Sequence, residues 1–204
     1  MGMFRIRGNS FAKIVSIIAL LIFLLNLILS RDYNIVMIML TGGGKLIDSL
    51  GVSYDSLFKE SQLYRSITYG YLHPAIWHLA VNVLALWYTG LYLEKVLNKV
   101  VIFLIYHAGL IIPCAVFVLL LSSDYMYGAS PAIFCCLGMM TMWLIIDHSM
   151  LDEYKRIRGN RYLLAYMIIS NFLGLGTFVI HLAGFCTGLL LGLFIRKNRG
   201  SHRP

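Results

Sequence analysis

Long apolar runs alternate with short polar segments along this chain of 204 residues. The first run covers residues 11–29 and carries one charged residue, Lys13, near its start. A helix of this run would be about 28 Å long, close to the hydrocarbon thickness of a bilayer. No small-x-small cleavage site follows it, so we expect an uncleaved first membrane span.

Five further runs have the composition of membrane spans, and they lie at about residues 74–93, 100–121, 131–146, 162–173 and 177–195. Residues 31–70 are too polar to span and too apolar for a disordered linker, so we expect an interfacial loop partly embedded among lipid headgroups. The pattern predicts an all-α integral membrane protein with a six-transmembrane-helix bundle at 11–196. Short cytoplasmic segments are expected at 1–10 and 197–204.

Composition and charge agree with a multi-pass membrane protein. Hydrophobic residues make up 59% of the chain and charged residues 13%, whereas soluble domains carry about a quarter charged residues. The net charge of +8 does not indicate nucleic acid, because in a membrane protein the placement of basic residues matters more than their sum. Six spans leave 13 of the 17 lysines and arginines on the side of both termini. We therefore expect both termini in the cytoplasm.

The second span carries polar side chains where a bilayer makes them costly. His78 and Asn82 are four residues apart and share one helix face at a separation of about 6 Å, and His73 stands at the helix mouth. Such a face could hydrogen-bond a neighbouring helix, bind a metal or donate to a developing anion. No carboxylate or thiolate stands at ligand spacing and no HExxH is present, so we expect neither metal nor cofactor.

A serine stands at the start of the fourth span. Ser130 follows Gly128 and Ala129 and precedes Pro131. Proline is well placed in the first turn of a helix, and serine is a good N-cap. The stretch predicts a loop that delivers a serine hydroxyl to the outer end of a helix that then enters the membrane.

The sixth span carries one polar feature, His181. Small residues follow it every four positions, at Gly184, Gly188 and Gly192. Such a stripe lets two transmembrane backbones approach closely, and the fourth span is a fitting neighbour. Taken alone, His181 is better explained as a buried histidine that donates to a carbonyl.

Together these pieces suggest one chemistry. Histidine is the usual base that takes the proton of a nucleophilic serine. The Ser130 amide, His78 and Asn82 could donate to the oxyanion of a tetrahedral intermediate. No Asp or Glu lies within a span where it could orient His181, so a serine hydrolase built this way would use a Ser–His dyad.

At this point the chain resembles the rhomboid intramembrane serine proteases. Four blocks carry the match over roughly residues 11 to 196: Tyr64-Arg65 with Leu72-His73 and His78-x-x-x-Asn82, Gly90-x-x-x-Glu94, Gly128-Ala129-Ser130, and His181-x-x-Gly184-x-x-x-Gly188. The resemblance implies a rhomboid-like six-helix bundle around a water-filled cavity. It also implies a mobile fifth helix and a cap loop that admit substrate.

By this resemblance Ser130 would be the nucleophile and His181 the general base. His78, Asn82 and the Ser130 backbone amide would bind the oxyanion, and Arg65 and Glu94 would be structural. Implied partners are transmembrane protein substrates and the lipid bilayer. The expected location is the plasma (inner) membrane, with the active site toward the external face.

Two residues depart from the family pattern. Pro131 replaces the glycine after the serine, and we expect it to crowd the space where substrate backbone must lie. Phe134 stands where some members carry tyrosine, and it can still stack on the His181 ring. An alternative is therefore a catalytically weak or inactive rhomboid-like protein that binds transmembrane clients. A third hypothesis is a transporter with a histidine proton relay. It is weaker, because the sequence shows no inverted repeats.

Overall fold

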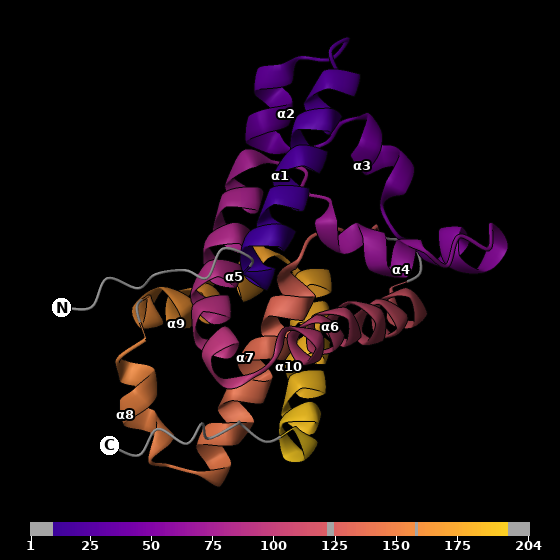
Figure 1. The fold of residues 1–204 in the computed structure, drawn as a ribbon. Helices are drawn as coiled ribbons and strands as arrows, with labels where there is room; N and C mark the ends of the chain where they lie inside the picture. The colour runs from indigo at the N-terminus through magenta and orange to yellow at the C-terminus, as the bar shows by residue number, and fades with distance from the viewer. Residues whose placement is uncertain (1–9, 122–124, 158, 196–204) are drawn as a thin grey trace.

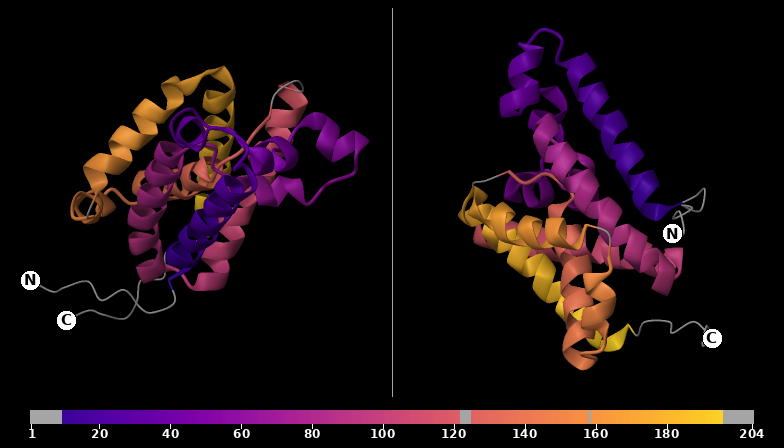
Figure 2. Two further views of the ribbon diagram at one scale, coloured as in Figure 1. Left: turned by 90° about the horizontal axis from the view of Figure 1, so that it is seen from above. Right: turned by 90° about the vertical axis from the view of Figure 1, so that its left-hand side faces the viewer.

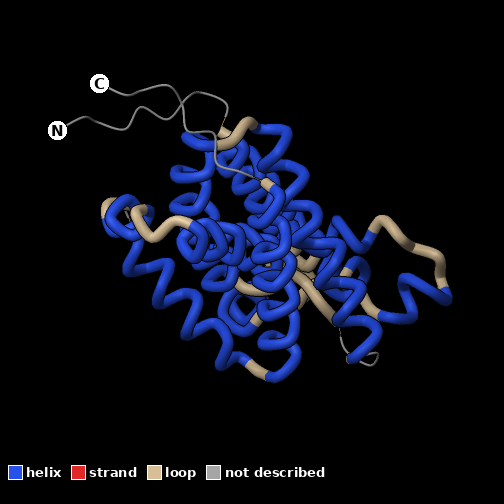
Figure 3. The backbone as a smooth tube through the Cα atoms, turned by 90° about the horizontal axis from the view of Figure 1, so that it is seen from below, coloured by secondary structure: helices blue, strands red, loops and turns tan. Residues whose placement is uncertain are grey.

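The structure is a computed structural model that describes residues 10–121, 125–157 and 159–195. Helices and loops make up these residues, and the strand-like pairing among them is an isolated antiparallel bridge between Val52 and Met126 (Figure 3). The predicted all-α class is confirmed. The predicted end segments 1–10 and 197–204 lie outside the described residues, apart from Ser10.

The predicted spans correspond to helices of the structure (Figure 1). These helices are α1 (Phe11–Leu29), α5 (Ile76–Val96), α6 (Lys99–Leu120), α7 (Ser130–Ile146), α9 (Asn160–Ile169) with the 3₁₀ turn η3 (Ser170–Leu173), and α10 (Leu175–Phe194). Four of them, α1, α5, α6 and α10, are long and apolar enough to cross a membrane. The prediction of a multi-pass membrane protein is confirmed. Because α7 has 17 residues and α9 has 10, the count of six crossings stays a prediction.

The segment between the first two spans contains more helix than a loop would. It forms α2 (Ile35–Thr41), α3 (Lys45–Leu50), the π turn η1 (Asp55–Lys59), α4 (Arg65–Thr68) and the 3₁₀ turn η2 (Tyr69–Tyr71). Asn26 of α1 anchors it, because its Nδ2 donates to the Gly43 carbonyl at 2.9 Å and its Oδ1 accepts from the Leu46 amide at 3.0 Å. This side chain is 1% exposed, so both bonds hold the segment from inside the protein.

The closest helix packing is between α7 and α10, which lie side by side in Figure 1. A methyl group at Gly184 would overlap the carbonyl oxygen of Pro131, and one at Gly188 would overlap that of Cys135. The two backbones therefore touch where the glycines are, as the stripe in the sequence predicts. This contact brings the start of α7 next to the middle of α10.

Helices α5 and α9 meet differently. Two tyrosines of α9 donate hydroxyl hydrogen bonds to α5: Tyr162 to the Val81 carbonyl at 2.7 Å and Tyr166 to Oδ1 of Asn82 at 2.9 Å. On its other side α5 packs along α1, as Figure 2 shows. The short helix α8 (Met150–Lys155) joins α7 to α9 at the end of α7 opposite Ser130.

Candidate active site

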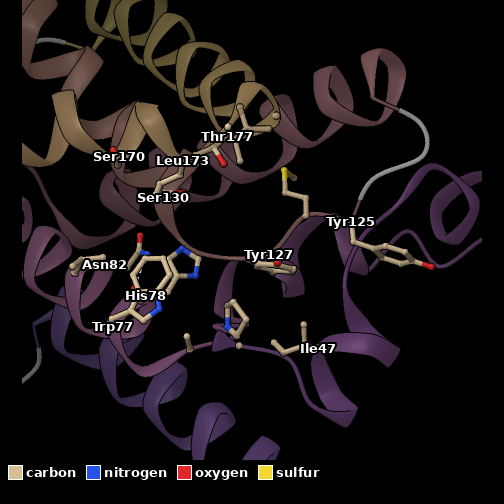
Figure 4. Close-up of a pocket in the computed structure, with 18 of the residues that line it drawn as sticks. Ile47, Trp77, His78, Asn82, Tyr125, Tyr127, Ser130, Ser170, Leu173 and Thr177 are labelled. Carbon is tan, nitrogen blue, oxygen red and sulfur yellow. Dashed lines mark hydrogen bonds between the residues drawn. The ribbon is translucent and has the colours of Figure 1, made fainter. Parts of the chain in front are cut away.

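A cavity of about 900 Å³ lies between α5, α7, η3 and α10 (Figure 4). Its lining includes four of the predicted site residues, which come from three different helices: His78, Asn82, Ser130 and His181. Residues separated by as many as 103 positions in the chain thus share one space. The helix order alone does not require this, so the shared cavity is the main structural finding about the site.

Ser130 is the first residue of α7 and is 6% exposed. The prediction that it caps the helix is wrong: Ala129 is the N-cap, and no side-chain cap hydrogen bond is made. The Ser130 hydroxyl is therefore not used to cap the start of α7. Gly128 precedes this turn with φ +107°, and a Cβ there would lie 2.8 Å from Cε1 of His78, so the turn requires glycine.

His181 lies in α10 with a 1% exposed side chain. Its ring stacks on Phe134 of α7, with centroids 4.0 Å apart and planes 9° apart. Nδ1 lies 3.1 Å from Oδ1 of Asn171, and Nε2 is buried with no hydrogen-bond partner among the described residues. Ser130 and His181 line the same cavity but make no hydrogen bond to each other in the described structure.

The amide of Asn82 is held in one orientation. Nδ2 donates to the carbonyl of His78 at 2.9 Å, and Oδ1 accepts the hydroxyl of Tyr166. A side-chain amide has two N–H donors, so one remains for a ligand in the cavity. The His78 ring also lines the cavity and contacts Tyr127, with centroids 6.3 Å apart.

His73 lies behind this face, in the linker between η2 and α5. It is 1% exposed, its Nδ1 lies 3.3 Å from the carbonyl of Tyr71, and its ring centroid is 5.3 Å from that of His78. Burial, together with the neighbouring His78, lowers the pKa of His73 to about 3. A carbonyl only accepts, so Nδ1 carries the proton of a neutral ring. His73 supports the His78 ring and is not among the described residues that line the cavity.

Pro131 lies in the first turn of α7, where its missing N–H costs no helical hydrogen bond. It is buried, its carbonyl faces Gly184, and it is not among the described residues that line the cavity. This placement does not support the expected crowding of substrate by the proline ring.

Arg65 and Glu94 lie away from the cavity lining as the structure describes it. Nη1 of Arg65 donates to the Gly51 carbonyl at 2.7 Å, which ties α4 to the end of α3. Glu94 accepts from the Ser10 hydroxyl at 2.7 Å and the Ala12 amide at 3.1 Å. A carboxylate at this position satisfies the free Ala12 amide at the start of α1 and interacts favourably with the helix dipole.

Two residues of the site were not singled out from the sequence: Tyr166, which holds Asn82, and Asn171, which contacts His181. Both lie in the fifth predicted span. An asparagine within a membrane span is costly, and this cost is the sequence signal that points to Asn171. As for metals, the described residues contain no group of three or more His, Cys, Asp or Glu that could hold an ion.

Comparisons with known proteins identify the family of this chain. The Rhomboid domain family model matches residues 60–198. RHOMBOID-like protein 7 of Arabidopsis thaliana is 29% identical over 71% of this chain and 46% of its own length. Rhomboid protease GluP of Bacillus subtilis is 32% identical over 79% of this chain and 31% of its own length, and Rhomboid-like protease 3 of Toxoplasma gondii is 26% identical over 90% and 68%. The chain spans less than half the length of the Arabidopsis and Bacillus relatives.

Proposed function

This chain belongs to the rhomboid family, and we propose that it is an intramembrane serine endopeptidase that works through Ser130 and His181. One observation carries the proposal: Nε2 of His181 is buried without a hydrogen-bond partner in the described part of the chain, and its ring lines the same cavity as Ser130 and Asn82. A buried polar atom without a partner is costly and commonly marks a functional site. Two relatives that are named as proteases add support.

The proposed reaction begins with proton transfer from Ser130 Oγ to Nε2 of His181 as the oxygen attacks the scissile carbonyl. The free N–H of Asn82, His78 and the Ser130 amide then donate to the oxyanion. His181 returns the proton to the leaving amine, and an acyl-enzyme forms. Water, activated by His181, hydrolyses the acyl-enzyme and restores the serine hydroxyl.

The Ser130–His181 hydrogen bond must form for this reaction to proceed. Catalytic hydrogen bonds are often long in the free enzyme and tighten when substrate binds. The Phe134 stack and the close packing of α7 on α10 hold His181 and Ser130 at the same cavity. The unformed bond is also the observation that favours the alternative, a rhomboid-like protein that binds transmembrane clients without cleaving them.

The proposed substrates are membrane proteins cleaved in or near a transmembrane segment. A helix must unwind locally before its peptide bond can reach Ser130, so substrates with helix-weakening residues are expected. We place both termini in the cytoplasm, the site toward the external face, and the protein in the plasma membrane. Support comes from the basic residues Lys95, Lys99 and Lys155, which flank the helix ends opposite Ser130.

The direct test uses full-length protein in liposomes with a single-span substrate. Ser130→Ala and His181→Ala should each lower the cleavage rate by at least about 1,000-fold, because each removes a group that the other needs. Ser149→Ala, at the start of α8, is the matched control and should cleave like the wild type. Equal cleavage by Ser130→Ala would show that Ser130 is not the nucleophile. Substrate binding without cleavage by the folded wild type would favour the client-binding alternative.

A further inference from the structure

Asn171 lies in η3, the short turn that joins α9 to α10. Its side-chain amide makes two hydrogen bonds at once. Nδ2 donates to the carbonyl of Met167 at 2.5 Å, and Oδ1 lies 3.1 Å from Nδ1 of His181. The side chain is half-buried, between the end of one helix and the histidine of the next.

The bond to Met167 determines which end of the amide faces the histidine. A backbone carbonyl accepts and never donates, so the atom beside it must be the NH₂ group of Asn171. The oxygen of the amide therefore faces His181 and must accept from it. The ring proton is then on Nδ1, and Nε2 keeps the lone pair that a general base needs.

Two contacts together fix the His181 ring. The stack on Phe134 sets the plane of the ring, with 9° between the two planes. The bond to Asn171 prevents rotation within and out of that plane. What remains free is Nε2, which has no hydrogen-bond partner in the described structure.

We propose that Asn171 is the positioning residue of His181 and acts on the Ser130–His181 dyad through the histidine ring. This inference rests on the proposed function of Ser130 and His181. When the serine proton moves to Nε2, the imidazolium donates Nδ1–H to the neutral amide, and Asn171 takes up no proton.

The competing explanation is that Asn171 only satisfies a carbonyl at the end of α9. Two substitutions separate its two bonds. Asn171→Ala removes both, whereas Asn171→Asp keeps an acceptor for His181 and removes the donor to Met167. Asn160→Ala is the matched control, because Asn160 also bonds a backbone carbonyl, that of Lys155 at 2.9 Å, at the other end of α9.

In liposomes with a single-span substrate, Asn171→Ala should lower kcat by about 10- to 100-fold and change KM by less than about 2-fold. Asn171→Asp should recover most of kcat, and Asn160→Ala should keep it. If the aspartate variant is as impaired as the alanine variant, the end of α9 explains the effect and the proposal is overturned. Unchanged kcat in Asn171→Ala overturns it as well.

A readout that needs no catalysis separates this inference from the proposed function. In full-length Ser130→Ala protein with ¹⁵N-labelled histidine, the His181 signals are identified by their absence in His181→Gln. They should show a proton on Nδ1 and none on Nε2 at neutral pH, and adding Asn171→Ala should produce a mixture of tautomers. An unchanged pattern contradicts the proposal. Cleavage by Ser130→Ala would instead show that Ser130 is not the nucleophile and would leave the tautomer result standing.

Discussion

Two helix pairs surround the candidate site, and they are held together by different interactions. In the pair α7 and α10, glycines let one backbone touch the other, and this pair carries Ser130 and His181. In the pair α5 and α9, tyrosine hydroxyls bridge the helices, and this pair carries Asn82. A backbone contact has no side chain that can move aside, whereas one hydrogen bond contributes only about 1 kcal/mol. We infer that the proposed nucleophile and base lie on the rigid pair and that the α5–α9 side adjusts to substrate.

The largest effect should come from breaking the rigid pair. In Gly188→Val the new side chain overlaps the Cys135 carbonyl, so α7 and α10 must separate. We expect the free energy of unfolding to fall by about 2–3 kcal/mol and cleavage to fall by about 100-fold, because Ser130 and His181 lose their alignment. Thermal unfolding and a cleavage assay measure the two effects.

The control for this prediction lies on the same helix. A Cβ at Gly176 would meet its nearest neighbours, Leu121 and Phe117, at 3.5 Å, which is ordinary contact. Gly176→Ala should therefore unfold within a few degrees of the wild type. If Gly188→Val is as stable as Gly176→Ala, α7 and α10 are not held by backbone contact.

The second pair offers a matched comparison between two tyrosines of one helix. Tyr166→Phe and Tyr162→Phe each remove one hydroxyl bond, so each should lower the free energy of unfolding by roughly 1 kcal/mol. Of the two tyrosines, Tyr166 bonds the proposed oxyanion residue Asn82, so its loss should lower kcat about 5- to 10-fold, and the loss of Tyr162 less than about 2-fold. Equal kcat values for the two variants would show that the Asn82 amide needs no support from α9.

The smallest effect is expected from Pro131→Gly, which restores the residue common in the family. Pro131 is buried in the first turn of α7 and faces Gly184. We expect cleavage to change by less than about 3-fold and the free energy of unfolding to fall by about 0.5–1 kcal/mol, because glycine has more freedom in the unfolded chain. A tenfold rise in cleavage would show instead that the proline obstructs substrate.

The sequence alone predicts the parts of this molecule that depend on local chemistry. Helix α1 spans residues 11–29 as its hydropathy predicts, because an uninterrupted apolar run has no competing structure in a bilayer. The glycine stripe predicts the close contact of α10 with α7, because only small residues permit it. The helical content of residues 31–70 was not predicted, since its short helices are held by distant anchors such as Asn26.

The site shows the same limit. Spacing within a helix places His78 and Asn82 together, but no pattern relates Asn171 to His181 or Tyr166 to Asn82. Those contacts depend on where α9 and η3 pack, which is a property of the whole fold. The sequence predicts a dyad because no acidic residue lies within a span beside His181, and this prediction stays untested. An amide can accept the same hydrogen bond without a charge.

The proposed role of Ser130 is tested by the mass of the protein after treatment with a fluorophosphonate probe, with the modified peptide mapped by fragmentation. We expect one adduct, on Ser130, in folded wild-type protein. Labelling should be lost in Ser130→Ala and strongly slowed in His181→Ala, because the hydroxyl then has no base. No adduct on Ser130 in correctly folded wild-type protein, or equal labelling of Ser130→Ala, would show that Ser130 is not the nucleophile.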